Sequence, residues 1–122
     1  AVSGKSITID SIKRWFSEKY LDDNPKVYNF FYNLLEKKNN EDFLPAYKIF
    51  VNSDNYYINY KNFNMPTLVM TGENEVGSTP LMSKGISEEI KNSSLYLIKN
   101  AKHGATIEQA KTVNEQIYKF LF

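Results

Sequence analysis

One histidine and two carboxylates, which lie in two separate loops of the sequence, are the side chains best suited to acid–base chemistry. Glu73 and Glu75 follow the apolar run 67–71, and His103, the single histidine, follows the apolar run 95–98. If these runs are neighbouring parallel strands, the two loops open on the edge where open α/β sheets place their sites. A carboxylate there can hold one ring N–H of the imidazole while the other ring nitrogen takes a proton from a nucleophile. The simpler alternatives are a polar loop histidine and a solvated loop acid.

The elements that would position these loops form a strand–helix–strand–helix series. The continuous apolar runs at 67–71 and 95–98 are typical of parallel strands covered on both faces. Between them Thr79-Pro80 marks a helix start, and after the second run Thr106 and Gln109 match a capping box. The residues expected on the buried faces of the two helices are Met82, Ile86, Ile90, Ala110, Val113, Ile117, Phe120 and Leu121. The strands would be joined by a right-handed crossover.

The first half of the chain shows helical patterns only. We expect one helix over about 9–20, a second after Asn24-Pro25, a third capped by Asp42, and a connector over 52–64. The residues expected to share apolar faces are Ile9, Ile12, Trp15, Phe16 and Tyr20 in the first helix, Val27, Phe30, Phe31, Leu34 and Leu35 in the second, and Phe43, Tyr47, Phe50 and Val51 in the third.

This set of elements does not make a finished fold. Two buried parallel strands leave unpaired edges and uncovered apolar faces. The sequence therefore predicts that further strands come from a missing N-terminal half or from a second copy of the chain, so a homo-oligomer is possible.

Composition limits the classes of function. At 122 residues the chain suits one domain with one core, and its net charge of +1 gives no reason to expect nucleic-acid or anionic-membrane binding. No apolar run reaches the length of about 20 residues that a membrane span needs. The absence of Cys excludes disulfides and thiolate chemistry. We expect a cytoplasmic protein that acts on a small molecule without a cofactor or metal.

Two segments resemble a known family. The run 65–75 followed by Thr79-Pro80 resembles the penultimate strand and acid loop of α/β-hydrolases, and the segment 101–103 followed by Glu108-Gln109 and an apolar helix resembles their histidine loop and last helix. The resemblance implies an α/β fold of which this chain is a C-terminal fragment. It implies that His103 is the triad base and that Glu75 stands where the family has its acid, usually Asp. Glu73 and an acid from an earlier strand are the alternatives.

The helical first half then corresponds to the lid of the family. We expect residues 1–62 to form this helical lid segment and residues 63–122 to form the C-terminal βαβα part of the core. Arg14 and Trp15 resemble a pair that faces the substrate in the 3-oxoadipate enol-lactonase-like branch. An Arg there could grip a substrate carboxylate, with Trp as an apolar wall. The alternatives are a surface charge for Arg14 and lid core for Trp15.

The nucleophile of the family lies in a Gly-x-Ser-x-Gly turn, which this sequence lacks. Ser78 precedes a helix, but it fits better as part of that helix's cap. We therefore expect the C-terminal portion of a hydrolase for small ester or lactone substrates, inactive alone because its serine lies outside this chain. The alternatives are a carbon–carbon bond hydrolase, a cofactor-free haloperoxidase-type branch, or a non-catalytic binding or assembly module.

Overall fold

The computed structural model describes residues 4–38 and 40–122 of the chain. The predicted lid segment 1–62 includes residues 1–3 and 39, which lie outside the described residues. The elements are α1 (Gly4–Trp15), α2 (Glu18–Asp23), α3 (Pro25–Glu36), α4 (Asn40–Val51), the 3-10 turns η1 (Ser53–Asn55) and η2 (Tyr60–Asn62), β1 (Thr67–Gly72), α5 (Pro80–Glu89), β2 (Ser93–Ile98), α6 (Ala105–Glu108) and α7 (Ala110–Leu121).

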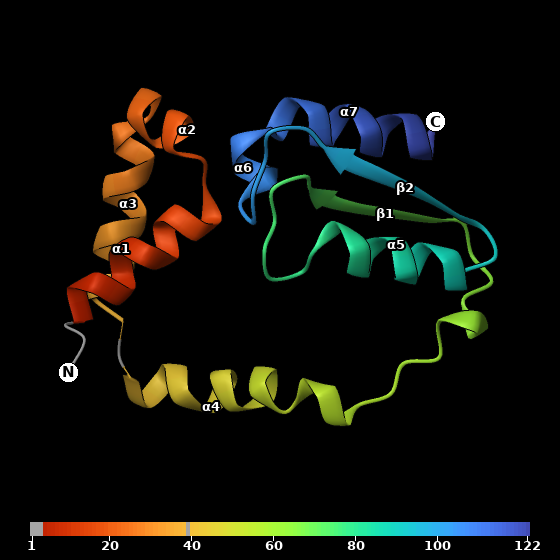
Figure 1. The fold of residues 1–122 in the computed structure, drawn as a ribbon, viewed down its shortest axis with the longest axis horizontal. Coiled ribbons are helices and arrows are strands. Elements are labelled where there is room, and N and C mark those ends of the chain that lie inside the picture. The colour runs from red at the N-terminus through yellow and green to blue at the C-terminus, as the bar shows by residue number, and fades with distance from the viewer. Residues whose placement is uncertain (1–3, 39) are drawn as a thin grey trace.

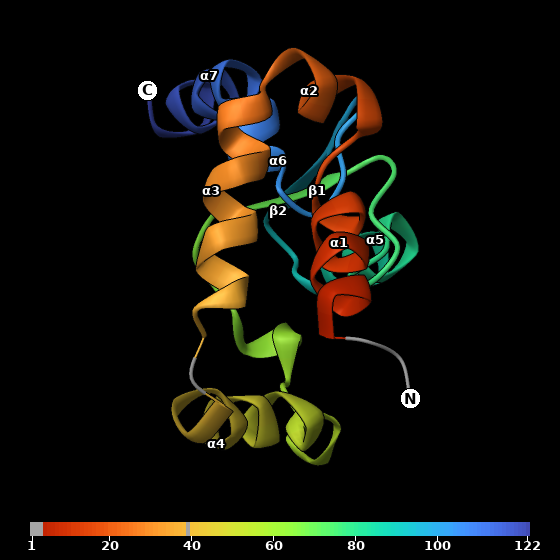
Figure 2. The same cartoon turned by 90° about the vertical axis from the view of Figure 1, so that its left-hand side faces the viewer.

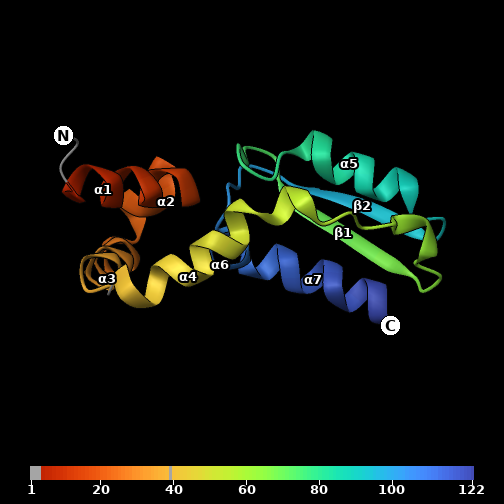
Figure 3. The same cartoon turned by 90° about the horizontal axis from the view of Figure 1, so that it is seen from below.

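The two strands form a parallel sheet with a helix on each face. β1 and β2 pair in register from Thr67 opposite Ser93 to Gly72 opposite Ile98. The sheet lies between α5 on one face and α7 on the other (Figures 1 and 3). Beneath α7 the core consists of Ile98, Ala101, Ala105 and Val113, with Met70 and Tyr96 packed against it. The predicted α/β class and the order of these four elements are confirmed.

The prediction of a single helix over 9–20 is wrong, because the structure has two helices there, α1 and α2. α1 ends at Trp15, and Ser17 caps α2 by accepting the backbone N–H of Tyr20 at 3.3 Å. Ile12 and Phe16 are fully buried on the expected face, and they form a second core with Leu21. Figure 2 shows α1 beside α3, with α2 joining them at one end. The apolar spacing identified the buried face but not the break within it.

The predicted start of α3 is confirmed, since Pro25 is its first residue. Asn24 stands at the cap position without a side-chain capping bond; its amide instead donates to the carbonyl of Tyr20 at 2.9 Å. The apolar face of α3 is split. Val27, Phe31 and Leu35 pack against the core of α1 and α2, while Phe30 and Leu34 are exposed.

Two predicted helix starts differ in the structure. α4 begins at Asn40, so Asp42 lies in its first turn rather than at its cap. The capping box at Thr106 is wrong as well, because Gly104 precedes the short α6 and Gln109 stands before α7 without a side-chain cap. By contrast, Thr79 caps α5 as predicted, accepting the N–H of Met82 at 3.3 Å.

Apolar side chains remain exposed on two helices. The expected face of α4 is exposed throughout, and α4 lies apart from α1–α3 (Figures 1 and 2). On α7 only Val113 is buried, while Ile117, Phe120 and Leu121 are exposed. Within the described residues each strand also has one edge without a strand partner. The need for further strands or a second copy stays a prediction. No described helix combines the length and apolar character of a membrane span.

Candidate active site

The candidate site lies where both strands end. The carboxyl ends of β1 and β2 point towards α1 and α2 (Figure 1). We call 73–78 the acid loop and 99–104 the histidine loop. Their backbones continue the contact made by the strands, since the N–H of Glu73 donates to Ile98 and that of Asn74 to Ala101, both at 2.9 Å. The two loops are therefore held side by side.

Gly72, the last residue of β1, lets the two loops approach. A Cβ at this position would lie 2.5 Å from the carbonyl oxygens of both Ala101 and Lys102. Real side chains do not tolerate such distances to backbone atoms, so the histidine loop can pass this close only above a glycine.

We expect Gly72→Ala to lower the free energy of unfolding by about 1–3 kcal/mol, because the backbone must shift to accommodate the methyl group. Gly85 in α5 is the matched control, since a Cβ there meets nothing within 4 Å. Gly85→Ala is expected to raise the free energy of unfolding by about 0.5–1 kcal/mol through its effect on helix propensity. Urea unfolding of the two variants beside the wild type measures both effects. Equal stability of the two variants would contradict the role given to Gly72.

The geometry joins Glu75 to His103. An oxygen of Glu75, Oε2, lies 2.6 Å from Nδ1 of His103, and the other, Oε1, accepts the backbone N–H of Gly77 at 2.6 Å. Glu75 is only 6% exposed, whereas the side chain of His103 is 54% exposed. A buried carboxylate with two hydrogen bonds thus holds Nδ1 of an accessible imidazole. The other ring nitrogen, Nε2, is left for proton transfer.

The surroundings of Glu75 favour its ionised form. Burial raises the pKa of the carboxyl group, but the hydrogen bond from Gly77, the bond and charge of His103 and the N–H of Ser78 together outweigh burial. The pKa of Glu75 is therefore held below its usual value. As a carboxylate, Glu75 can accept the Nδ1 proton of His103 and stabilise a positive charge on the ring.

Glu73, the alternative acid of the same loop, lies elsewhere. It is exposed, and its Oε2 accepts the backbone N–H of Asn100 at 3.1 Å. Asn100 has a positive φ of 57°, a conformation that Asn adopts more readily than most residues. Glu73 thus supports the start of the histidine loop, and Glu75 is the acid of this loop that contacts the imidazole. Residues 4–38 and 40–66 contain no strand before β1 that could supply the third alternative, an acid from an earlier strand.

Arg14 and Trp15 lie at the end of α1, next to these loops. A Cβ at Gly77 would come within 2.5 Å of the Arg14 guanidinium and 3.2 Å of Glu75 Oε1, so the exposed Arg14 reaches the acid loop. Trp15 is half-buried and packs edge-on against Phe31, with ring centroids 5.7 Å apart. This placement fits the lid-core interpretation of Trp15. Substrate contact by either residue stays a prediction.

A cavity of about 270 Å³ adjoins the pair, with Glu75, His103 and Thr106 in its walls and apolar side chains of the sheet at its base. No three His, Asp or Glu residues of the described chain lie close enough together to hold a metal ion.

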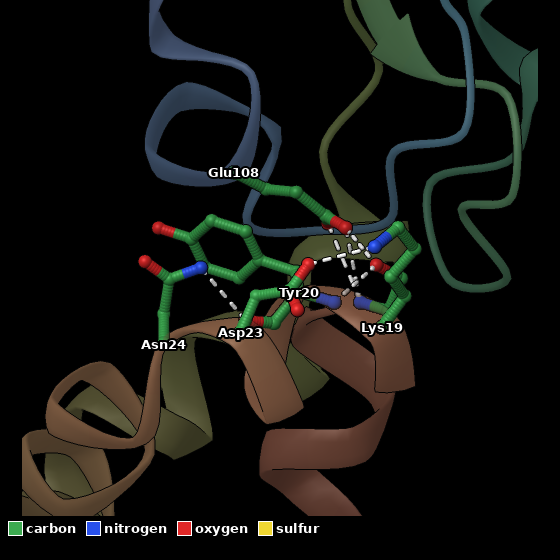
Figure 4. A network of polar contacts seen from close by, with 6 residues as sticks. Lys19, Tyr20, Asp23, Asn24 and Glu108 are labelled. Atoms are coloured by element: carbon green, nitrogen blue, oxygen red, sulfur yellow. Dashed lines mark hydrogen bonds and ion pairs between the residues drawn. The ribbon is translucent and has the colours of Figure 1, made fainter.

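The sequence predicted no role for Ser17, and it pointed to Glu108 only through the family resemblance. In the structure, the Glu108 carboxylate reaches from α6 to the start of α2 (Figure 4). The local sequence carries no signal for a contact between residues 91 positions apart.

Comparison with known proteins supports the fold. No protein-family model matches the chain. It is 25% identical over 115 residues to the (E)-2-((N-methylformamido)methylene)succinate hydrolase of Acinetobacter baylyi, covering 90% of this chain and 41% of that protein. The enol-lactonase from Burkholderia xenovorans LB400 superposes with a TM-score of 0.83 at 19% identity, over 95% of this chain and 44% of that chain.

A third relative is MGS-M2, an α/β-hydrolase enzyme from a Medee basin deep-sea metagenome library. Its TM-score is 0.75 at 21% identity, over 97% of this chain and 44% of that chain. The chain thus spans less than half the length of these three relatives. With its parallel βαβ unit, closing helix and helical first half, the chain has the fold of the C-terminal part of an α/β-hydrolase.

Proposed function

We propose that this chain supplies the lid and the acid–base half of the triad of a hydrolase for small ester or lactone substrates. The observation that carries the proposal is the bond from the buried Glu75 carboxylate to Nδ1 of the accessible His103 at 2.6 Å. In this proposal residues 1–62 form the lid, residues 63–122 form the end of the core, and the serine comes from residues outside this chain.

The reaction follows from the positions of these groups. His103 Nε2 takes the proton of the serine hydroxyl as its oxygen attacks the substrate carbonyl, and Glu75 stabilises the imidazolium that forms. His103 then gives this proton to the leaving alcohol. Water repeats the sequence on the acyl-enzyme, releasing the acid and restoring the serine. No cofactor is required for these steps.

We propose further that the substrate carries a carboxylate near the lid. The Acinetobacter relative is named for a succinate, which is a dicarboxylate. The exposed guanidinium of Arg14 lies beside Gly77 of the acid loop. Gly77 follows Glu75 by two residues. Guanidinium and carboxylate form paired, charge-assisted hydrogen bonds. Arg14 would therefore bind the anionic end of the substrate, and Trp15 would line the apolar side.

Arg14→Ala is expected to raise KM for an anionic ester by about 10- to 100-fold, because a hydrogen-bonded charge pair contributes about 1.5–3 kcal/mol. KM for a neutral ester of similar size should change little. The matched control is Lys13→Ala, which removes the neighbouring exposed cation of the same helix. Steady-state kinetics on both esters measure the effect. An equal rise in KM for both esters would contradict carboxylate binding by Arg14.

The proposed activity is tested on the protein expressed from its complete reading frame. Short p-nitrophenyl esters and lactones should be hydrolysed, and a serine-reactive phosphonate should stop the reaction. A folded protein that turns over none of them would contradict the proposal. Cleavage of a β-diketone would identify a carbon–carbon bond hydrolase, and halogenation with peroxide would identify a haloperoxidase-type enzyme. The 122-residue chain alone should be inactive.

The exposed apolar side chains suggest where the rest of such a hydrolase binds. Ile117, Phe120 and Leu121 of α7 are exposed beside a sheet whose strands each have an unpaired edge within the described residues. We propose that strands of the N-terminal half, or of a second copy of the chain, cover these surfaces. Burying them would stabilise the complex by about 25 cal/mol per Å² of apolar area.

A further inference from the structure

The residues on either side of His103 are both bonded to the end of α1. The N–H of Gly104 donates to the carbonyl of Trp15 at 2.6 Å, and Nζ of Lys102 donates to the carbonyl of Lys13 at 2.8 Å. The last carbonyls of a helix have no partners within that helix. Here the histidine loop supplies partners for two of them, so the end of α1 and the histidine loop are joined.

Glu108 makes a second connection between the same parts. Its carboxylate accepts the hydroxyl of Ser17, the backbone N–H of Ser17 at 3.2 Å and the backbone N–H of Lys102 at 3.5 Å. Ser17 is the cap of α2, and Lys102 precedes His103. Figure 4 shows Glu108 reaching from α6 to the start of α2. The same carboxylate also contacts the residue before the imidazole.

The ring of Phe16 packs closely against the histidine loop. Phe16, between α1 and α2, is 1% exposed, and a Cβ at Gly104 would lie 2.3 Å from its ring. The histidine loop thus rests on the ring of Phe16, and Glu108 accepts the backbone N–H of Lys102 in the same loop. Ser17 and Glu108 also line a cavity of about 570 Å³, so the hydrogen bonds of Glu108, rather than filled space, hold Ser17 against the histidine loop.

We infer that Glu108 is a positioning residue, which sets the orientation of His103 by fixing the histidine loop to Ser17. The inference rests on the proposed function in that the oriented ring is the triad base. Glu108 touches no reacting group. It acts through Lys102 and Ser17, and its removal would leave the Glu75–His103 pair intact in composition but loosened in geometry.

The test uses Glu108→Gln in the protein from the complete reading frame. Gln keeps the size of the side chain but replaces one acceptor oxygen with an NH₂ donor, which faces the N–H groups of Ser17 or Lys102. We expect kcat to fall by about 10- to 100-fold with KM nearly unchanged, because a misplaced catalytic group costs rate rather than binding. Glu115→Gln, an exposed carboxylate on α7, is the matched control and should behave as the wild type.

A spectroscopic readout separates positioning from stability. His103 is the single histidine of the chain, so in this region its Nδ1 proton and ring ¹⁵N signals are identified by comparison with His103→Ala. In the wild type the Nδ1 proton should be shifted downfield and slow to exchange, because it is bonded to Glu75. Glu108→Gln should shift this signal upfield or broaden it by exchange, and Glu115→Gln should not.

Ser17 provides the reciprocal test. Ser17→Thr keeps the hydroxyl and the helix cap, and it should retain both the signal and kcat. Ser17→Ala should lower kcat, and combining it with Glu108→Gln should cost less than the sum of the single effects, because both act on one contact. Fully additive effects would contradict the inference.

The outcomes distinguish this inference from the proposed function. A wild-type protein without hydrolysis overturns the proposed function, while a changed Nδ1 signal in Glu108→Gln still supports the role of Glu108 in setting the imidazole. If Glu108→Gln is less stable but keeps wild-type kcat and an unchanged Nδ1 signal, Glu108 is a structural contact only and the inference fails.

Discussion

Replacing His103 with alanine is expected to lower kcat by about 10⁴- to 10⁶-fold in the protein from the complete reading frame, with KM nearly unchanged. The imidazole is the proposed proton acceptor for the serine, and no other histidine of this chain can replace it. Single-turnover and steady-state hydrolysis of a p-nitrophenyl ester measure the loss. Retention of wild-type turnover would contradict the assignment of His103.

Loss of activity must be separated from loss of fold. His103→Ala removes one of the partners of the buried Glu75 carboxylate, so it should lower the free energy of unfolding by about 1–3 kcal/mol. Added imidazole should restore part of the rate, since it can occupy the space beside Glu75 and accept the proton. A variant that is unfolded, or that imidazole does not rescue, would leave no support for a base at this position.

Glu75→Gln has the second largest expected effect, a fall in kcat of about 10⁴-fold. The amide oxygen can still accept the N–H of Gly77, which turns its NH₂ group towards His103. The ring then accepts at Nδ1 and carries its proton on Nε2, where it cannot receive one from serine. The matched control is Glu73→Gln, which alters the exposed acid bonded to Asn100 and should keep most of the activity. A larger loss in Glu73→Gln would reverse the assignment of the acid.

The same carboxylate predicts a pH dependence of stability. The pKa of Glu75 is lower in the folded chain than its usual value, so its contribution is complete above the unfolded pKa and is lost as pH falls through the folded pKa. The free energy of unfolding should therefore fall on acidification more in the wild type than in Glu75→Gln. Urea unfolding at a series of pH values measures the difference. Parallel curves would contradict this contribution.

Local sequence predicts the elements that carry the site because their signals are local. Apolar runs bounded by Pro66 and Gly72 define β1, and Thr79 with Pro80 defines the start of α5. The break between α1 and α2 could not be predicted in this way. The apolar spacing of Ile12, Phe16 and Tyr20 continues across Ser17 without a gap, and the Glu108 carboxylate that binds Ser17 lies 91 positions later.

Spacing alone also could not decide whether Glu73 or Glu75 contacts the imidazole. Both follow β1, but the chain turns at this point, with the N–H of Glu75 donating to Gly72 at 3.1 Å. The turn directs Glu75 inwards, to His103, and leaves Glu73 at the surface. The prediction that Ile117, Phe120 and Leu121 are buried was wrong for a related reason. Periodicity shows that α7 has an apolar face, whereas burial depends on a neighbouring surface that must be present.

The attachment of the histidine loop to the end of α1 has a consequence for recombination between related enzymes. If the helical segment were exchanged for that of a relative, the element boundaries would suggest a crossover in the connector 52–64. Such a graft would replace the carbonyls of Lys13 and Trp15 and the hydroxyl of Ser17 but keep the loop that is bonded to them. Functional chimeras should therefore be those whose donor segment also has an aromatic ring that packs on Gly104, as Phe16 does, and a hydroxyl opposite Glu108, whatever their overall identity.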